Sequence, residues 1–323
     1  MPFPVPRFLL VILLACVPVA ADPVTRLAFG SCCRQNKPAP IFDSICQYNP
    51  DVWIWMGDNI YADTADPAVA TGKYRRLATH AGYKALCDSC AVIGTWDDHD
   101  YGKNDAGKEF PGKKASQQRF LDFLRVPADD PRRTREGVYA SHTYGDGDQA
   151  VKVILLDTRY HRDLPGPDAD ILGDAQWEWL ENELTGSTAA VHLLVSSIQL
   201  VPCDHRFEKW ADFPQAHRRL YGLLARDGIP PVTVLSGDRH LAEISVEKDA
   251  VPYPLHDITS SSLNSPGGGN QDEPNTRRLG ENYRDANFGT LTIDWSTTPP
   301  TLAFAIRDLA GAPVREVTLR QER

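Results

Sequence analysis

Short apolar runs alternate with longer amphipathic stretches along most of the chain. Runs of a few residues that are rich in β-branched and aromatic side chains are typical of buried strands. They predict strands over residues 25–29, 52–56, 91–95, 150–156, 191–196, 232–236 and 291–295. Apolar residues at helical spacing predict helices over residues 114–124, 173–184 and 213–225. The alternation predicts an α/β fold in which helices cover the sheet.

Four short polar motifs each follow one of these predicted strands. In open α/β sheets, ligands bind at the carboxyl ends of the strands, where the following loops meet. All four motifs are rich in metal ligands, so together they predict a cluster of two or more metal ions, a type of site that mostly performs phosphate-ester chemistry. The motifs are Gly30-Ser31-Cys32, Gly57-Asp58-Asn59-Ile60-Tyr61, Trp96-Asp97-Asp98-His99-Asp100 and Gly237-Asp238-Arg239-His240.

Asp58 is the first candidate ligand. Gly57 permits a sharp turn after the strand, which would expose the Asp58 carboxylate where it can bridge two cations. Tyr61 follows three residues later, and its phenolate would be a hard, anionic ligand that suits Fe(III). A lone Gly-Asp pair would be an ordinary turn, but this longer motif after an apolar strand favours a metal site. Asn59 is a candidate for a supporting position beside the ligands.

The run Asp97-Asp98-His99-Asp100 is a stronger signal. Its carboxylates repel one another unless cations neutralise them. The alternative, a solvated acidic turn, is disfavoured because the preceding strand should be buried. Asp98 is a candidate ligand and Asp97 a supporting residue. His99 could bind metal, hold a neighbouring ligand, or donate a proton to a leaving oxygen.

Asp238 and His240 are two residues apart, so in an extended segment both face the same side and both could bind one cluster. Arg239 should then point elsewhere. Arg159, in a Leu-Asp-Thr-Arg motif after another predicted strand, could hold phosphate oxygens with both guanidinium nitrogens. A surface salt bridge is an equally good interpretation of Arg159.

Cys32 ends the first predicted strand and would be a soft, strongly donating ligand as a thiolate. Its alternative is a disulfide to Cys46 or Cys203, although the adjacent Cys33 could form that disulfide and leave Cys32 free. The two other downstream cysteines form a Cys87-Asp88-Ser89-Cys90 motif. A local disulfide is favoured there over a redox pair, and a zinc half-site would need a second such pair.

The N-terminus has the layout of a secretory signal peptide, with Arg7 before an apolar run and Val19-Ala20-Ala21 as a cleavage site. We therefore expect a signal peptide over residues 1–21, a single domain over residues 22–323, and export to the periplasm or the extracellular space. An alternative is a lipoprotein signal in which Cys16 is lipidated. No other apolar stretch is long enough to cross a bilayer, and export favours disulfides.

The chain of 323 residues has 34 basic and 43 acidic residues, which gives a net charge of −9. This acidic balance, without basic runs, predicts no surface for nucleic acid and none for anionic membranes. The Ser- and Gly-rich stretch over residues 260–270 predicts a mobile surface loop. It is not a phosphate-binding P-loop, because no Gly-Lys-Ser/Thr follows it.

The ordered motifs FGSC, GDNIYAD, WDDHDYG, LDTR and LSGDRH, which run from Phe29 to His240, resemble those of the PhoD-like alkaline phosphatases. The resemblance implies a two-sheet metallophosphoesterase sandwich flanked by helices, with Fe(III) and Ca(II) at the strand ends. It implies iron ligands at Cys32 and Tyr61 and a bridging Asp58. Residues implied to bind the second metal or complete the cluster are Asp98, Asp238 and His240. Asp replaces the first His of the wider superfamily's last motif, which favours a hard cation such as Ca(II) and disfavours zinc.

The expected function is therefore hydrolysis of phosphate monoesters or diesters by attack of a metal-bound hydroxide. His99 would assist the leaving group and Arg159 would steady the phosphate. The alternatives are a phospholipase D-like phosphodiesterase at the same site and a metal- or phosphate-binding protein without turnover. The chain leaves little room for the N-terminal β-domain of longer family members, and its C-terminus is short. The preference between monoesters and diesters, and the oligomeric state, stay open.

Overall fold

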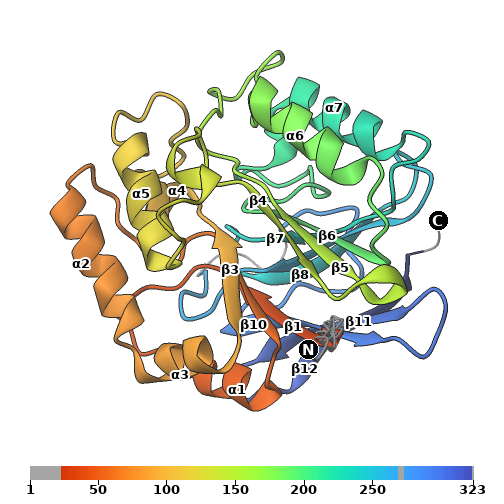
Figure 1. Ribbon diagram of the computed structural model, residues 1–323, viewed down its shortest axis with the longest axis horizontal. Helices are drawn as coiled ribbons and strands as arrows, with labels where there is room; N and C mark the ends of the chain where they lie inside the picture. Colours follow the sequence, from red (N-terminus) through yellow and green to blue (C-terminus); the bar gives the residue numbers. More distant parts are fainter. Residues whose placement is uncertain (1–22, 268–272, 322–323) are drawn as a thin grey trace, which may run out of the picture.

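The computed structural model describes residues 23–267 and 273–321 (Figure 1). Two six-stranded sheets pack face to face in this part of the chain, and helices cover the outer face of each sheet. The predicted α/β sandwich is confirmed. The predicted signal peptide and Cys16 lie outside the described residues, and no described helix has the length and apolar character needed to cross a membrane.

The first sheet has the strand order β12-β11-β10-β1-β2-β3. Strands β1, β2 and β3 are parallel to one another, whereas β10, β11 and β12 join them as an antiparallel extension. The strands are β1 (Arg26–Gly30), β2 (Val52–Met56), β3 (Ala91–Thr95), β10 (Asn287–Asp294), β11 (Thr301–Asp308) and β12 (Pro313–Arg320).

The second sheet has the order β4-β5-β6-β7-β9-β8, with four parallel strands in the middle and an antiparallel strand at each edge. The strands are β4 (Ala140–Tyr144), β5 (Val151–Leu155), β6 (Val191–Ser196), β7 (Thr233–Ser236), β8 (Ala242–Glu247) and β9 (Leu255–Ser260).

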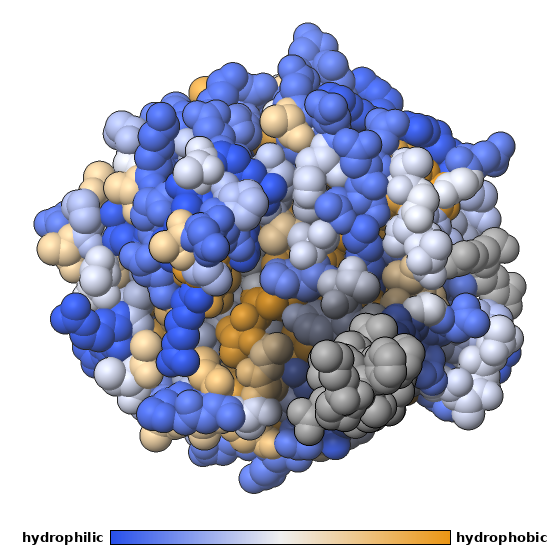
Figure 2. Space-filling view, viewed as in Figure 1, coloured by the Kyte–Doolittle hydropathy of each residue, from blue (hydrophilic) through white to orange (hydrophobic). Residues whose placement is uncertain are grey.

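Helices pack on the two outer faces of the sandwich. Those outside the first sheet are α1 (Ile41–Tyr48), α2 (Pro67–Ala78), α3 (Ala81–Ser89), the short α4 (Asp98–Tyr101) and α5 (Lys113–Phe123). Those outside the second sheet are α6 (Asp174–Leu184) and α7 (Pro214–Leu224). On the face seen in Figure 2, hydrophilic side chains cover most of these helices and apolar ones gather near the middle of the view.

Strand β2 shows why the chain forms this layered core. All five of its residues are buried, and side chains alternate between the faces of a strand. Trp53 and Trp55 pack under the helices, while Ile54 and Met56 pack between the two sheets. A strand covered on both faces is apolar at every position, which is the pattern that predicted it.

The seven predicted strands and three predicted helices are all present, with bounds shifted by a few residues. Several of the strands that the sequence did not predict carry polar side chains in their interiors, as β9 does with the buried Asp257. The local disulfide predicted between Cys87 and Cys90 is not formed, since both are free thiols. The Cys90 thiol instead donates to the carbonyl oxygen of Leu86 at 3.4 Å.

Candidate metal centre

The carboxyl ends of the parallel strands of both sheets meet at one edge of the sandwich, and backbone hydrogen bonds join the loops that follow them. Cys33 N–H donates to Asp58 O at 2.9 Å, which links the loops after β1 and β2. Gly237 N–H donates to Ser197 O at 3.1 Å, which links the loops after β7 and β6. All four polar motifs therefore arrive at the same place, from two sheets.

Two glycines permit this close approach of the loops. A Cβ atom on Gly57 would lie 2.5 Å from Cβ of Asp97, and one on Gly237 would lie 2.6 Å from the carbonyl oxygen of Met56. Both distances are shorter than real Cβ contacts allow, so any larger residue would push the loops apart. Gly57 also has a φ of 95°, which side chains rarely adopt.

The candidate ligands occupy unusual backbone conformations. Cys32, Asp58, Asp238 and His240 all have positive φ angles, between 50° and 69°. A non-glycine residue in the left-handed region costs of order 1–3 kcal/mol, and such residues cluster at functional sites. The conformation turns each side chain back over the end of its strand, toward the other motifs.

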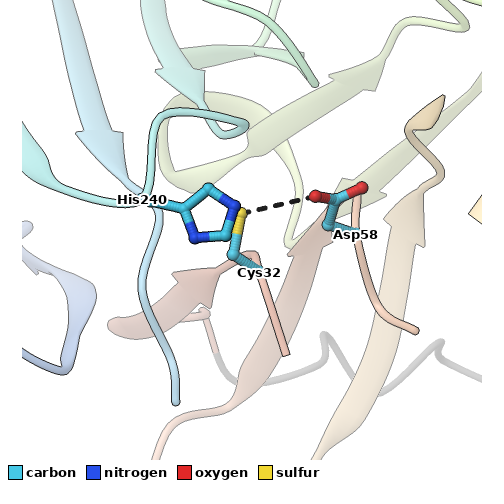
Figure 3. Close-up of side chains that lie close together, drawn as sticks. All are labelled: Cys32, Asp58 and His240. Carbon is cyan, nitrogen blue, oxygen red and sulfur yellow. Dashed lines mark hydrogen bonds between the residues drawn. The ribbon is translucent and has the colours of Figure 1, made fainter. Parts of the chain in front are cut away.

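One end of the cluster combines a thiol, a carboxylate and an imidazole. Cys32, Asp58 and His240 each offer a ligand atom within 4.8 Å of the others (Figure 3). Cys32 Sγ lies 3.5 Å from Oδ2 of Asp58. The Tyr61 hydroxyl lies 3.0 Å from Nε2 of His240. We call Cys32, Tyr61 and His240 the thiolate end.

Charge favours a thiolate at Cys32. Burial alone would raise the pKa of this thiol, but the neighbouring His240 lowers it to about 6. The same pair raises the pKa of His240 to about 9, chiefly through the negative charge on Cys32. Burial and the anions Cys32 and Asp58 raise the pKa of Tyr61. A cation bound here would reverse that effect and favour the phenolate.

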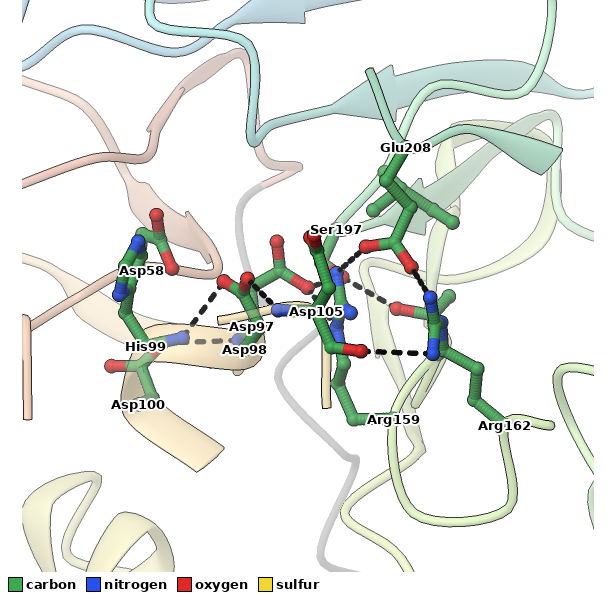
Figure 4. Close-up of polar contacts among 12 residues, drawn as sticks. Asp58, Asp97, Asp98, His99, Asp100, Asp105, Arg159, Arg162, Ser197 and Glu208 are labelled. Carbon is green, nitrogen blue, oxygen red and sulfur yellow. Dashed lines mark hydrogen bonds and ion pairs between the residues drawn. The ribbon is translucent and has the colours of Figure 1, made fainter. Parts of the chain in front are cut away.

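The other end of the cluster is built from carboxylates. Asp58, Asp98 and His99 form a second group of ligand atoms within 4.8 Å of one another, and Asp97, Asp98 and Asp238 form a third. Asp58 thus belongs to the first two groups and Asp98 to the last two, so the three groups form one continuous chain of donors. Figure 3 shows the first group, and Figure 4 shows Asp58, Asp98 and His99 of the second. We call Asp97, Asp98 and Asp238 the carboxylate end.

These carboxylates fit bound cations. Oδ1 of Asp58 and Oδ2 of Asp97 are buried and have no hydrogen-bond donor among the described residues. Burial and the neighbouring acidic groups raise the pKa of Asp58 well above its ordinary value, and burial does the same for Asp97. A buried anion without a partner is strongly destabilising, so the arrangement fits metal ions that accept these lone pairs.

Hydrogen bonds hold Asp98 in place. Its Oδ2 accepts from the backbone N–H of Asp105 at 2.7 Å, and its Oδ1 accepts from that of His99 at 2.8 Å. Although burial opposes ionisation, Arg159 and His99 lower the pKa of Asp98 below its ordinary value. These contacts fix the orientation of Asp98 and favour its ionised form.

His99 lies beside the cluster, on helix α4. Its Nδ1 is 2.6 Å from Oδ1 of Asp63, and its ring lies 4.2 Å from that of Tyr61. Burial lowers the pKa of His99, but the hydrogen bond to Asp63 and the charge of Asp98 outweigh it and raise this pKa. The contact with Asp63 therefore favours the protonated imidazole beside the candidate metal ligands.

Arg159 is fully buried beneath the cluster. Its Nε donates to Oδ1 of Asp97 at 2.5 Å, and its second nitrogen pairs with Glu208 (Figure 4). Ser197 Oγ also donates to Oδ1 of Asp97 at 2.6 Å. The supporting position predicted for Asp97 is therefore only part of its role, because one oxygen is held from below and the other faces Asp98 and Asp238. A direct contact of Arg159 with phosphate stays a prediction.

Asn59 supports the cluster through its backbone as well as its side chain. Its N–H donates to Oδ2 of Asp100 at 3.1 Å, and its side-chain amide donates to the carbonyl oxygen of Thr95 at 3.2 Å. These bonds tie the loop after β2 to the end of β3. A supporting role of Asn59 beside bound metal stays a prediction.

The surface loop predicted over residues 260–270 is wrong for its first half. Ser260, Ser261 and Ser265 are buried, and the last two contact the thiolate end. Ser261 Oγ lies 3.1 Å from Cys32 Sγ and accepts from the His240 N–H at 3.0 Å. The carbonyl oxygen of Ser265 contacts Nδ1 of His240. The unpredicted strand β9 ends at Ser260, whose Oγ donates to Oδ1 of Asn287 at 2.9 Å. Ser265 Oγ accepts from Nε of Arg34 at 2.9 Å.

Above the cluster lies a cleft of about 870 Å³. Asp98, His99, Asp238 and His240 form part of its floor. Arg239 was predicted to point elsewhere, but it lines this cleft, because Asp238 and His240 have left-handed backbone conformations and the segment is not extended. The sequence predictions did not include the other basic side chains of the lining, which come from loops far apart in the chain. They are Arg34, Lys37, Arg206 and Arg284.

The two packed sheets and the outer helices have the arrangement of the metallophosphoesterase fold, and the donor cluster lies at the strand ends. The family model of the PhoD-like phosphatases matches residues 71–296, and the chain belongs to this family. Alkaline phosphatase D of Bacillus subtilis is 23% identical over 280 residues, which cover 73% of this chain and 47% of that protein. The chain therefore spans about half the length of this relative.

Solved structures confirm the fold. A structure of PhoD matches with a TM-score of 0.71 and 19% identity, covering 93% of this chain and 69% of that one. A dimetal phosphatase from Danio rerio matches with a TM-score of 0.55 and 11% identity, covering 93% of this chain and all of the other. GAP50, described as the anchor in the inner membrane complex of Plasmodium, matches with a TM-score of 0.61 and 12% identity. The match covers 94% of this chain and 90% of that one. At these identities the likeness is one of fold.

Proposed function

We propose that this protein is a metal-dependent phosphatase that hydrolyses phosphate monoesters, phosphate diesters or both. The observation that carries the proposal is the continuous chain of three donor groups, joined through Asp58 and Asp98. Bound cations would hold phosphoryl oxygens and activate the attacking water. No phosphoserine intermediate is expected, because Ser31 has no imidazole or carboxylate partner among the described residues.

Fe(III) at the thiolate end and Ca(II) at the carboxylate end are the cations that we propose. A thiolate, a phenolate and an imidazole suit a transition metal, whereas carboxylate oxygens alone suit a hard ion such as Ca(II). Cys32, Tyr61 and His240 would hold the first ion, and Asp97, Asp98 and Asp238 the second. Asp58 would bridge them. Other divalent ions could replace Ca(II) at a site of this composition.

His99 is proposed to donate a proton to the leaving oxygen. It lines the cleft beside Asp98, and the contact with Asp63 raises the pKa of its ring. Arg159 is proposed to support the phosphate site through Asp97, the group with which it pairs. A protonated imidazole facing the cleft is the arrangement that general acid catalysis needs.

Metal analysis of the purified protein together with hydrolysis of a chromogenic monoester and diester tests this proposal. Stoichiometric iron and calcium, with activity that Asp58→Asn abolishes, is the expected result. If the protein supplied with iron and calcium binds neither metal and hydrolyses neither ester, the proposal is wrong. Retention of phosphate without turnover would identify a binding protein instead. Faster turnover of a phospholipid head-group diester than of either test ester would favour a phospholipase D-like phosphodiesterase.

We also propose that the protein is exported, which rests on the sequence pattern of residues 1–21. Expression of the full chain followed by N-terminal sequencing of the exported product tests this. A product that begins at Asp22 is expected. A product that begins at Cys16 and carries a lipid would identify the lipoprotein alternative, and retention of the intact chain inside the cell would refute export.

A further inference from the structure

The cleft above the metal ligands holds more positive charge than one phosphate ester would use. Four basic side chains line it without an ion pair to any carboxylate in the described part of the chain. We call them the basic rim, and they are Arg34, Lys37, Arg206 and Arg284. A net charge of −9 makes such a gathering around an acidic cluster unexpected by chance.

Arg34 is fixed in place by three contacts. Its backbone N–H donates to Asn264 at 2.7 Å, its Nε donates to Ser265 Oγ at 2.9 Å, and its guanidinium lies 4.0 Å from the ring centre of Tyr61. Only one of the three guanidinium nitrogens is used by these hydrogen bonds. The two others are available to an anion next to the thiolate end.

Arg284 reaches the same side of the cleft. One nitrogen contacts the carbonyl oxygen of Gly267 at 3.4 Å, while Nη1 is buried and has no partner among the described residues. Gly267 in turn donates its N–H to the carbonyl oxygen of His240 at 2.9 Å. A buried guanidinium nitrogen without an acceptor is costly, and an anionic ligand would satisfy it.

Arg206 lies on the loop that connects β6 to α7. Its guanidinium is 5.0 Å from the ring centre of Phe207, and Arg239 lies 4.2 Å from the same ring. Arg239 pairs with Glu273, whereas Arg206 is exposed and has no carboxylate partner among the described residues. Basic side chains thus approach the metal ligands from separate loops.

The acidic groups in the cleft do not balance the basic rim. Asp98 and Asp238 belong to the donor cluster, Glu208 pairs with Arg159 and Arg162, and Glu273 pairs with Arg239. The exposed Asp105 is the one further carboxylate among the described residues that line the cleft, so it offsets at most one of the four basic side chains. Cations bound to the cluster would add further positive charge beside the rim. A single scissile phosphate, held by those cations, leaves the rim without a counter-charge.

On the basis of the proposed phosphatase function, we propose that the substrate is a phosphate ester with a second anionic group, which the basic rim binds. The second group would be a phosphate or a carboxylate, both of which match a guanidinium. The metal ligands would select the scissile phosphate, and the rim would select esters that carry additional negative charge.

The test compares three esters with the same leaving group: one whose other substituent is neutral, one that adds a carboxylate and one that adds a phosphate. The readout is kcat/KM of each charged ester divided by that of the neutral ester, for the metal-loaded enzyme. The wild type should prefer a charged ester by about tenfold or more, since charge-assisted contacts of this type have that strength. The preference should weaken with added salt.

The double variant Lys37→Glu with Arg206→Glu should reduce this ratio to about one or below. Both residues are exposed, so the fold should tolerate the change. Lys248→Glu is the matched control, because Lys248 is exposed and follows β8, at the opposite end of β9 from the cleft. An unchanged ratio in the double variant, or a ratio of one in the wild type, would overturn the proposal. Equal preference for both charged esters would indicate recognition of charge, and preference for the added phosphate alone would indicate recognition of phosphate.

A second measurement separates this proposal from the proposed function. If no ester is hydrolysed, the phosphatase function fails, but binding of inorganic tripolyphosphate can still be measured by calorimetry. Binding that is at least about tenfold weaker in the double variant than in the wild type and in Lys248→Glu would support an anion-binding rim. Equal binding by all three proteins would overturn the rim as well.

Discussion

The two ends of the donor cluster differ in chemistry although they share Asp58. The thiolate end offers sulfur, nitrogen and a phenol oxygen, whereas the carboxylate end offers oxygen alone. The neighbouring groups that hold the ligands in place also differ. Serine hydroxyls and a backbone carbonyl contact the thiolate end, whereas a buried arginine contacts the carboxylate end. One edge of a sandwich can therefore build two unlike coordination environments a few ångströms apart, suited to two different cations.

The difference has a structural origin. Strands β1 and β2 belong to the first sheet and supply Cys32, Asp58 and Tyr61, while β3 supplies Asp97 and Asp98. The loop after β7 of the second sheet divides its ligands between the ends. With positive φ at both Asp238 and His240, the first side chain reaches the carboxylate end and the second reaches the thiolate end.

Removing the shared ligand should affect both ends and have the largest effect. Asp58→Asn keeps the shape of the side chain but removes the bridging charge, so kcat should fall by about 10³-fold. Both metals should bind more weakly, as measured by elemental analysis after dialysis. Retention of both metals with normal kcat would show that the two ends do not depend on Asp58.

Cys32→Ser should affect the thiolate end. The loss of the soft ligand should lower iron content and remove the visible absorption expected from a tyrosinate bound to Fe(III), while kcat falls by about 10²-fold. Calcium binding should be much less affected. An iron-loaded variant with the wild-type spectrum would exclude Cys32 as a ligand.

Asp238→Asn should have the converse effect. The carboxylate end would lose one negative charge, so the calcium concentration that gives half-maximal activity should rise by about 10- to 100-fold. Excess calcium should restore much of the activity, and the iron-dependent spectrum should persist. If the variant lost the iron-dependent spectrum as well as its response to calcium, the two ends would form a single site.

Arg159→Lys should have a smaller effect, because Arg159 acts through Asp97. The ammonium group keeps the charge but cannot bind Asp97 and Glu208 together as the guanidinium does. Mutating an outer-shell partner typically costs 10- to 100-fold in metal affinity, so we expect about tenfold weaker calcium binding. Arg159→Gln should be worse than Arg159→Lys. Unchanged calcium affinity in both variants, with a raised KM for substrate, would favour direct contact with phosphate.

Asp257 is a buried carboxylate outside the donor cluster, and we compare it with Asp58. Its substitution should have the smallest effect, which concerns stability and not catalysis. Asp257 accepts hydrogen bonds from Ser236 Oγ at 2.6 Å and from the N–H groups of Leu200 and Val201 at 2.9 and 3.1 Å. Burial raises its pKa from 3.8 to about 6. Unlike Asp58, it has donors for its charge and needs no cation.

The folded state binds the proton of Asp257 more tightly than the unfolded state does. The contribution of Asp257 to the free energy of unfolding therefore falls as pH rises from about 4 to about 6. The loss amounts to at most about 3 kcal/mol for a shift of this size. Asp257→Asn does not titrate there, so its stability relative to the wild type should increase over that pH range. Urea unfolding of both proteins, without metal, at pH 4 and pH 7 measures this difference. A difference that does not change with pH would contradict the raised pKa.

Several parts of the structure could be predicted from the sequence because the signal is local. Strands such as β2 are apolar at every position, and the motifs after them carry dense, mutually repelling acids. The structure brings all six candidate ligands together. Strands such as β9 were missed because buried polar groups, Asp257 among them, interrupt the apolar pattern.

The supporting residues could not be predicted because their signal lies in distant contacts. Asp63 contacts His99 only because its loop folds back over α4, and Ser261 contacts Cys32 across 229 positions of sequence. Arg34, Arg206 and Arg284 are ordinary surface residues by local pattern. Only the convergence of three loops places them around one cleft.

The cluster lies across the boundary between the two sheets, because the first sheet supplies Asp58 and the second supplies Asp238 and His240. A cation held by both is a crosslink that exists only in the folded chain. By mass action, an ion present at 100 times its dissociation constant adds about 2.7 kcal/mol to the free energy of unfolding. The melting temperature should therefore rise with metal concentration, and a chelator would loosen the sandwich as well as stop the reaction.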